Sequence, residues 1–162
     1  MFRNEVAQQA ATGRGGWEDV WAWVGAHSGL SDSDRAALAR DFFSGDRLDQ
    51  ELVDFIRDLR PRLRTALLTN AFGAARHELT HRWKIADAFD AIIVSAEEGV
   101  IKPHPRIYRL ALERLGVAPQ EALFIDDVEE NVVGARAVGM HALRFESPAQ
   151  AMEDVRGWIG GR

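Results

Sequence analysis

The sequence predicts an α/β fold, with a parallel β-sheet covered by helices on both faces and a small all-helical region before it. The residue pattern changes near position 47. Up to Asp46 apolar residues recur only at helical spacing, whereas from Leu48 helical segments alternate with short apolar runs. Strands separated by helices of this length form βαβ units, and their right-handed crossovers make the sheet parallel. We therefore expect a helical cap over residues 1–46 and an α/β core over residues 47–162.

The composition fits an ordinary soluble globular protein. With 162 residues, of which 46% are hydrophobic, the chain can bury a sizeable core. No stretch approaches the roughly 20 apolar residues of a membrane span, and the start MFRNEVAQQA lacks the apolar block of a secretory signal. We therefore expect a cytoplasmic protein that has no membrane partner. Cysteine is absent, which excludes disulfides, thiolate zinc sites and cysteine nucleophiles.

The net charge of -5 argues against nucleic acid as a partner, although an anion could still bind in a locally positive pocket. One basic cluster could attract a polyanion, and it consists of Arg57, Arg60, Arg62 and Arg64. Such arginines more often solvate a helix end and the loop after it, and we favour that interpretation.

Three helices are expected before the core, at about residues 6–10, 17–24 and 36–43. The second contains Trp17, Trp21 and Trp23. Because two of the three lie on its apolar stripe, we favour core packing over the lining of a ligand pocket.

The core is expected to contain three buried strands, at residues 65–69, 91–95 and 122–126, and a last strand at residues 140–145. Helices are expected around them, at about residues 48–59, 74–84, 105–115, 129–138 and 148–159. Pro61 stops the first of these helices and Gly139 ends the fourth. In parallel sheets of this type, ligands bind beyond the carboxyl ends of the strands.

Polar side chains follow three of the predicted strands. The run LLTN ends in Thr69 and Asn70, the loop GVIKPHP contains Lys102, and FIDD ends in Asp126 and Asp127. Each feature has a structural explanation when taken alone: a turn, an exposed loop lysine, or an acidic cap for the next helix. Together, at successive strand ends, they favour one shared functional site.

With these three motifs in this order, the chain from about Leu48 to Arg162 resembles the haloacid dehalogenase superfamily. LLTN resembles the second motif of that family, GVIKPHP the third, and FIDDVEENVVGARAVGM the fourth. The helices before Leu48 resemble the small helical cap of one subclass. The resemblance implies a three-layer, Rossmann-like fold, and a magnesium-dependent phosphatase that hydrolyses a small phosphate ester through an aspartyl-phosphate.

By this resemblance, Asp126 is a direct Mg²⁺ ligand and Asp127 a ligand through water or a neighbouring group. Lys102 is the catalytic cation between nucleophile and phosphate. The Thr69 hydroxyl and the Asn70 N–H bind phosphate oxygens. These roles suit the chemistry, because Mg²⁺ prefers oxygen ligands and because a phosphate dianion and an attacking carboxylate repel each other until positive charge is supplied. The acidic pair favours phosphate chemistry over dehalogenation.

The first motif of the family has no counterpart in this sequence. In the family it is a strand ending in Asp-x-Asp, lying before the cap and at the centre of the sheet, and its first aspartate is the nucleophile. The segment MFRNEVAQQA contains neither an apolar strand nor an Asp-x-Asp pair. The Asp-x-Asp at Asp32-Ser33-Asp34 opens a helical run, and we interpret it as a helix cap. We therefore expect a missing central strand, a chain that is inactive as it stands, and unpaired sheet edges that favour a homo-oligomer.

Two other functions fit part of the pattern. A non-catalytic binding module, self-associating through its sheet edges, could retain the phosphate and metal cradle. A receiver-type signalling domain also uses paired aspartates, a threonine and a lysine. Its acidic pair normally comes near the start of the chain, whereas here the pair follows Lys102. We favour the phosphatase.

Overall fold

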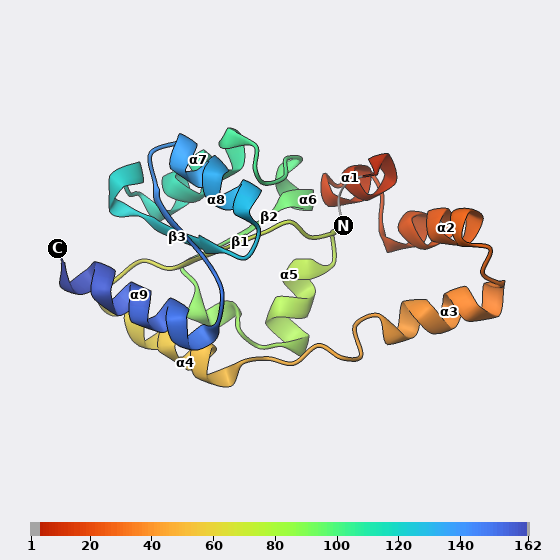
Figure 1. The fold of residues 1–162 in the computed structure, drawn as a ribbon, viewed down its shortest axis with the longest axis horizontal. Coiled ribbons are helices and arrows are strands. Elements are labelled where there is room, and N and C mark those ends of the chain that lie inside the picture. The colour runs from red at the N-terminus through yellow and green to blue at the C-terminus, as the bar shows by residue number, and fades with distance from the viewer. Residues whose placement is uncertain (1–3, 162) are drawn as a thin grey trace.

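The computed structural model describes residues 4–161, which form an α/β body and an N-terminal helical arm (Figure 1). The arm consists of α1 (Glu5–Ala11), α2 (Trp17–Ser28) and α3 (Asp32–Asp41). The strands of the body are β1 (Ala66–Thr69), β2 (Ala91–Val94), β3 (Leu123–Asp126) and β4 (His141–Arg144). Its helices are α4 (Gln50–Leu59), α5 (Ala75–His77), α6 (Ser95–Glu98), α7 (Pro105–Leu115), α8 (Glu129–Ala137) and α9 (Pro148–Gly160). A π-helical turn covers Glu78–Arg82, and 3-10 turns cover Ala86–Ala88 and Pro119–Glu121.

The four strands of the described chain form two separate two-stranded sheets. β1 pairs in parallel with β2, so that Ala66–Thr69 lies opposite Ala91–Val94. β3 pairs in parallel with β4, so that Leu123–Asp126 lies opposite His141–Arg144. The predicted α/β fold with parallel strands is thus confirmed. The missing central strand between the two sheets stays a prediction.

Helices lie on both faces of the strands, as expected for three layers. α7 and α8 pack on one face, where the buried core includes Tyr108, Phe124 and Val132. α4 and α9 lie against each other on the other side (Figure 1). Three of the strands, β1, β2 and β3, are almost entirely apolar, as is usual for strands of a sheet covered on both faces. Across the described residues, no helix is long and apolar enough to cross a membrane.

Several element boundaries differ from those expected, and three of the differences have a structural consequence. The helix expected at residues 74–84 divides into α5 and the π-helical turn. Ser95 starts the short helix α6 instead of ending β2. α3 starts earlier than expected, at Asp32, because the Ser31 hydroxyl accepts a hydrogen bond from the Asp34 N–H. The Asp-Ser-Asp stretch is therefore the first turn of a capped helix, in agreement with the helix-cap interpretation.

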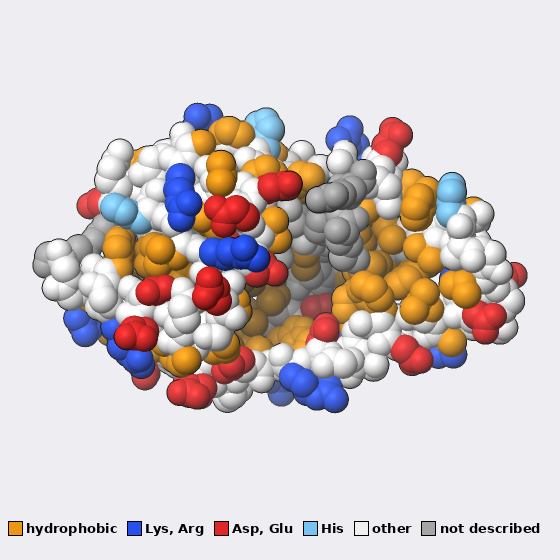
Figure 2. Space-filling view, in the orientation of Figure 1, with side chains coloured by type: hydrophobic (Ala, Val, Ile, Leu, Met, Phe, Trp, Pro, Cys, Tyr) orange, Lys and Arg blue, Asp and Glu red, His pale blue; other side chains and the backbone are white. Residues whose placement is uncertain are grey.

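An aromatic cluster joins the arm to the body. The ring of Trp17 stacks on Trp21 at 5.7 Å between centroids and packs against Phe72 at 4.3 Å. Phe42 and Phe43, just after α3, complete the cluster. Phe72 follows β1 by three residues and is buried, with 5% of its surface exposed. Trp17 and Trp21 therefore pack as the sequence predicts. Figure 2 shows hydrophobic side chains gathered over the arm, around the hollow between arm and body.

Two of the four clustered arginines are paired with carboxylates. Arg57 Nε lies 2.9 Å from Asp87 Oδ2, and Arg60 Nη2 lies 2.9 Å from Asp90 Oδ1. These pairs tie the end of α4 to the segment just before β2. For these two arginines the structure agrees with the helix-end interpretation.

Acidification is expected to remove a stabilising contribution from Asp90. Its carboxylate accepts hydrogen bonds from the Thr65 N–H at 2.8 Å and from Arg60 at 2.9 Å, and these hold the pKa of Asp90 below its ordinary value. In the unfolded chain an aspartate has a pKa of about 3.9. A carboxyl whose pKa is lower in the folded state stabilises the fold above that unfolded value, and this stabilisation is lost as the pH falls through the folded value.

The Asp90→Asn variant should therefore lose less stability than the parent chain when urea unfolding is repeated from about pH 6 down to about pH 3. Asp58→Asn, an exposed position on α4, provides the matched control and should follow the parent. If the free energy of unfolding fell equally steeply with pH in all three proteins, this account of Asp90 would be contradicted.

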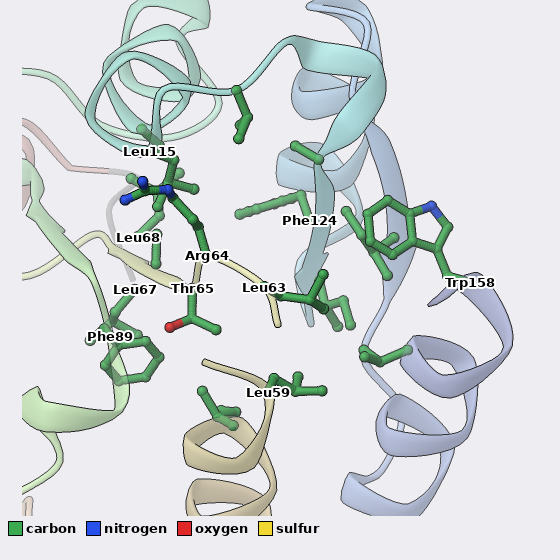
Figure 3. A pocket seen from close by; sticks show the side chains of 18 of the residues that line it. Leu59, Leu63, Arg64, Thr65, Leu67, Leu68, Phe89, Leu115, Phe124 and Trp158 are labelled. Carbon is green, nitrogen blue, oxygen red and sulfur yellow. The ribbon is translucent and has the colours of Figure 1, made fainter. Parts of the chain in front are cut away.

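A large apolar cavity separates the two sheets. It has a volume of about 520 Å³ and is lined by β1, β3, α4, α9 and the end of α7. Figure 3 shows Leu67 and Leu68 of β1 on one side of this space, and Phe124 of β3 and Trp158 of α9 on the other.

Candidate active site

Lys102 joins the carboxyl ends of β1 and β3. Its Nζ donates to the Leu68 backbone oxygen at 2.9 Å and to Asp126 Oδ2 at 2.6 Å. The ion pair is buried, with only 10% of the lysine side chain and 6% of the aspartate side chain exposed. The structure thus brings together two of the residues that the sequence places at separate strand ends. Because buried charges are screened little, both groups act strongly on anything that binds beside them.

Asn70 fixes the loop that carries Lys102. Its side chain donates to the Lys102 backbone oxygen at 3.0 Å and accepts from the Lys102 N–H at 2.8 Å. The Lys102-Pro103 peptide bond is cis, and Gly134 of α8 packs against Pro103. A Cβ at position 134 would lie 2.8 Å from Pro103 Cβ, so glycine is needed for this close approach. The Asn70 side chain is therefore a clamp for the lysine loop, a role that the sequence did not reveal.

A buried hydrogen-bond network holds the Asp126 carboxylate. Its Oδ1 accepts from the Val128 N–H and from Asn131 Nδ2, both at 2.9 Å. The Tyr108 hydroxyl in turn donates to the Asn131 backbone oxygen at 2.8 Å. Burial, with a smaller contribution from the Asp126 charge, raises the pKa of Tyr108, so its hydroxyl remains a donor. The carboxylate is thereby fixed in one orientation before any ligand arrives.

Ser95, which directly follows β2, fixes the loop after β1 by hydrogen bonds. It is fully buried, and its hydroxyl accepts from the Ala71 N–H at 3.0 Å and donates to the Ala71 oxygen at 3.2 Å. This holds the chain directly after Asn70. Sequence reasoning missed Ser95 and Asn131. Their signal in the sequence is a polar residue beside a buried apolar run, as in AIIVS and EENVV.

Three groups near the ion pair remain available to a ligand. Thr69 is half-buried at the end of β1, and Asp127 is exposed after β3. Within residues 4–161 neither side chain has a hydrogen-bond or ion-pair partner. An ammonium group carries three donors, and Lys102 Nζ uses two of them on groups of the described chain. The site therefore offers a hydroxyl, a carboxylate and a cationic N–H at one edge of the strands.

The acidic pair fits part of a Mg²⁺ coordination shell. Asp126 Oδ2 accepts one hydrogen bond, from Lys102, and so keeps a lone pair for a metal, while its Oδ1 already accepts two. Asp127 adds a second, exposed carboxylate. The described part of the chain contains no group of three or more His, Cys, Asp or Glu side chains placed to hold a metal. Mg²⁺ commonly keeps several waters and binds through one or two carboxylates plus phosphate, so this pair suits it better than a metal that needs a full protein cage.

Comparison with known sequences identifies the family. A sequence model of the haloacid dehalogenase-like hydrolases matches residues 7–139. The chain belongs to this family. The match covers most of the arm, the lysine loop and the acidic pair, so it confirms the resemblance drawn from the motifs.

The curated relatives include phosphatases. Sesquiterpene phosphatase astK of Aspergillus oryzae is 29% identical over 161 residues, which make up 99% of this chain and 82% of that protein. Phosphoserine phosphatase of Thermus thermophilus is 38% identical over 130 residues, with 74% of this chain and 52% of that protein covered. The chain spans less than two thirds of the length of most of the curated relatives it matches.

A solved structure supports the fold. A haloacid dehalogenase family enzyme of Bacteroides thetaiotaomicron, in complex with magnesium and inorganic phosphate, has a TM-score of 0.70 to this chain at 22% identity. The superposition covers 90% of this chain and 76% of that one. At this identity the likeness concerns the fold alone.

Proposed function

We propose that the residues around Lys102 and Asp126 form the phosphate- and Mg²⁺-binding part of a phosphatase active site. The observation that carries the proposal is the buried ion pair at the carboxyl ends of β1 and β3. Beside it, Thr69 and Asp127 have side chains without partners in the described chain. The substrate is a small phosphate ester. The phosphatase relatives support the same class of reaction.

Each group has a defined task in this site. The Thr69 hydroxyl and the Asn70 N–H donate to phosphate oxygens. The remaining N–H of Lys102 donates to the phosphate or to the incoming carboxylate, which lowers the repulsion between these two anions. Asp126 Oδ2 and Asp127 would hold Mg²⁺, which would supply further positive charge at the phosphate oxygens. The hydrogen bonds to Asp126 Oδ1 keep the carboxylate oriented while the other oxygen binds.

The attacking carboxylate comes from outside the described residues. In an aspartyl-phosphate mechanism, an aspartate oxygen bonds to phosphorus while the alcohol oxygen of the ester leaves. The one Asp-x-Asp within residues 4–161 lies in the exposed first turn of α3, on the arm. Asp126 is engaged by Lys102 and Asn131. The chain by itself is therefore expected not to hydrolyse a phosphate ester.

The alcohol released from the ester is expected to be apolar. The aromatic cluster of the arm reaches the site through Phe72 and through Ile101, the neighbour of Lys102. Trp17 is half-buried and Phe42 is 46% exposed, so aromatic surface remains open to a ligand. Figure 2 shows hydrophobic side chains around the hollow between arm and body. A relative that matches nearly the whole of this chain is a sesquiterpene phosphatase, which agrees with an apolar ester.

Binding of inorganic phosphate, measured calorimetrically with and without MgCl₂, tests the site. Phosphate should bind about tenfold more tightly, or better, when Mg²⁺ is present. Asp127→Asn should reduce this enhancement about tenfold. Asp41→Asn, exposed at the end of α3, should leave it unchanged. The proposal would be overturned if Mg²⁺ did not change the affinity for phosphate, or if both substitutions reduced the Mg²⁺ enhancement equally.

A non-catalytic binding module with the same cradle is the alternative, and the edges of β1 and β3 that have no strand partner within residues 4–161 favour it. Both functions predict phosphate binding, but only the phosphatase predicts turnover once an aspartate-bearing strand is present. A chain extended at its N-terminus by a strand ending in Asp-x-Asp should hydrolyse p-nitrophenyl phosphate with Mg²⁺, and the present chain should not. Inactivity of both chains would favour the binding module. Self-association through the edges stays a prediction, which sedimentation of the present chain tests.

A further inference from the structure

The helical segment after β1 contains the sequence His77-Glu78-Leu79-Thr80-His81. Two side chains four positions apart lie on the same face of a helix. The pattern His-Glu-x-x-His on a helix is a recurring arrangement for binding Zn²⁺ through its two histidines. So short a pattern also occurs without a metal, so the structural context of the two rings decides whether they can bind one.

The rings of His77 and His81, here called the histidine pair, contact each other. Their centroids are 4.4 Å apart and their planes meet at 46°. Both residues are exposed, and within residues 4–161 neither ring has a hydrogen-bond or ion-pair partner. A neutral imidazole offers one nitrogen lone pair. Two such lone pairs on contacting rings can converge on a single ion at the usual Zn–N distance of about 2.0–2.1 Å.

The other three histidines of the sequence are placed differently. His27 lies on α2, where its Nδ1 is 2.8 Å from the Trp23 oxygen. The Nδ1 of His104 accepts a hydrogen bond from a backbone N–H at 3.2 Å. His141 is the first residue of β4. In the part of the chain that the structure describes, the histidine pair is therefore the one place where two imidazole rings meet.

The backbone that carries the histidine pair is fixed to the body. Arg76 Nη2 donates to the Ile92 oxygen at 2.8 Å, and its Nε donates to Glu97 Oε1 at 2.9 Å. The Trp83 N–H bonds the Glu78 oxygen, five residues back, at 2.9 Å and closes the π-helical turn. Such turns are rare and occur frequently at functional sites. An ordered segment also loses less conformational entropy when its side chains bind an ion.

We propose that the histidine pair is a Zn²⁺ site, with His77 and His81 as its protein ligands and water in the remaining positions. Imidazole suits Zn²⁺, whereas Mg²⁺ prefers oxygen ligands. No third His, Cys, Asp or Glu of the described residues is placed to join the pair, so the ion stays open to solvent. The site shares no residue with the proposed phosphatase site and does not depend on it.

Metal binding, and not peptide hydrolysis, is the role that we assign to this segment. In metalloproteases with the same pattern, the glutamate is the general base. Here the Glu78 carboxylate lies 3.3 Å from Arg82 Nη1, on the same helical segment. An arginine partner favours the charged carboxylate and lowers its basicity, so Glu78 is a poor proton acceptor.

Titration of the full-length, untagged chain with Zn²⁺, in competition with a zinc-sensitive dye, tests the proposal. Removal of a group that only orients a metal ligand costs about 10–100-fold in affinity. His77→Gln and His81→Gln should therefore each weaken the tightest Zn²⁺ binding at least about tenfold. The double variant should lose little more than either single variant, because each of these already breaks the chelate. His27→Gln, an exposed histidine on α2, is the matched control and should bind as the parent does.

Cu²⁺ identifies the ligands directly, since imidazole sites bind it more tightly than Zn²⁺. Pulsed EPR with one equivalent of Cu²⁺ should detect two coordinated imidazoles in the parent chain and one in each single variant. Roughly a hundredfold excess of MgCl₂ should not displace Zn²⁺, because Mg²⁺ prefers oxygen ligands.

Equal Zn²⁺ affinity in the parent, His77→Gln and His81→Gln would overturn the proposal, and so would an equal loss in His27→Gln. Displacement of Zn²⁺ by MgCl₂ would assign the ion to Asp126 and Asp127, which also contradicts it. Both histidines are exposed, so the urea midpoint of the metal-free variants should match that of the parent. None of these measurements uses phosphate, so failure here is distinct from failure of the proposed phosphatase site.

Discussion

Replacing Lys102 with methionine is expected to lower the free energy of unfolding by about 3–5 kcal/mol. Methionine keeps most of the apolar length of the side chain but removes its charge. The Asp126 carboxylate, 6% exposed, would then be a buried charge without its counterion. The Leu68 oxygen would also lose the donor that lies 2.9 Å away. Urea unfolding at neutral pH measures this loss, provided that the slope of unfolding free energy against urea concentration is compared between the variants.

A double-mutant cycle isolates the ion pair. If the pair is responsible, Lys102→Met combined with Asp126→Asn should lose much less stability than the sum of the two single variants. Lys84→Met, at an exposed site, should stay within about 0.5 kcal/mol of the parent. Strictly additive losses would show that the lysine and aspartate do not stabilise each other.

Phe72→Ala is expected to cost about 3–5 kcal/mol, the range for removing a buried phenylalanine. The ring is 5% exposed and packs with Ala10, Ala11 and Val20 of the arm. Its centroid lies 4.3 Å from that of Trp17. Because Phe72 belongs to the body and its partners to the arm, the loss should appear both in thermal stability and in the hydrogen-exchange protection of α1.

Phe42→Ala provides a control within the same aromatic cluster. Phe42 contacts Trp17 and Trp21 but is 46% exposed, so its removal should cost no more than about 1 kcal/mol. Similar losses for Phe42→Ala and Phe72→Ala would mean that burial at the junction does not decide the stability of the arm.

Much of the fold could be predicted because its signals are local in sequence. Apolar runs of four or five residues mark the strands, and helical spacing with capping residues marks the helices between them. The pairing of Lys102 with Asp126 follows from the same pattern, since both residues come after strands whose carboxyl ends meet at one edge. The motifs also identified the family, which the match to residues 7–139 confirms.

The supporting contacts could not be predicted, because they join distant parts of the chain. Asn70 and Lys102 are 32 positions apart, and Tyr108 reaches Asn131 over 23. A sequence marks such residues only as polar positions beside apolar ones, which is also the pattern of ordinary turns and caps. The division of the expected helix at residues 74–84 has a similar origin, since nothing in its composition distinguishes a π-helical turn from an α-helix.

The division of the body into two small sheets also bears on how the chain folds. β3, α8 and β4 follow one another directly, and β1 and β2 enclose a single short crossover. Contacts this local form quickly, and neither pair has to wait for the other. The lysine–aspartate bridge and the buried core that both sheets share under α7 and α8 then bring the two units together.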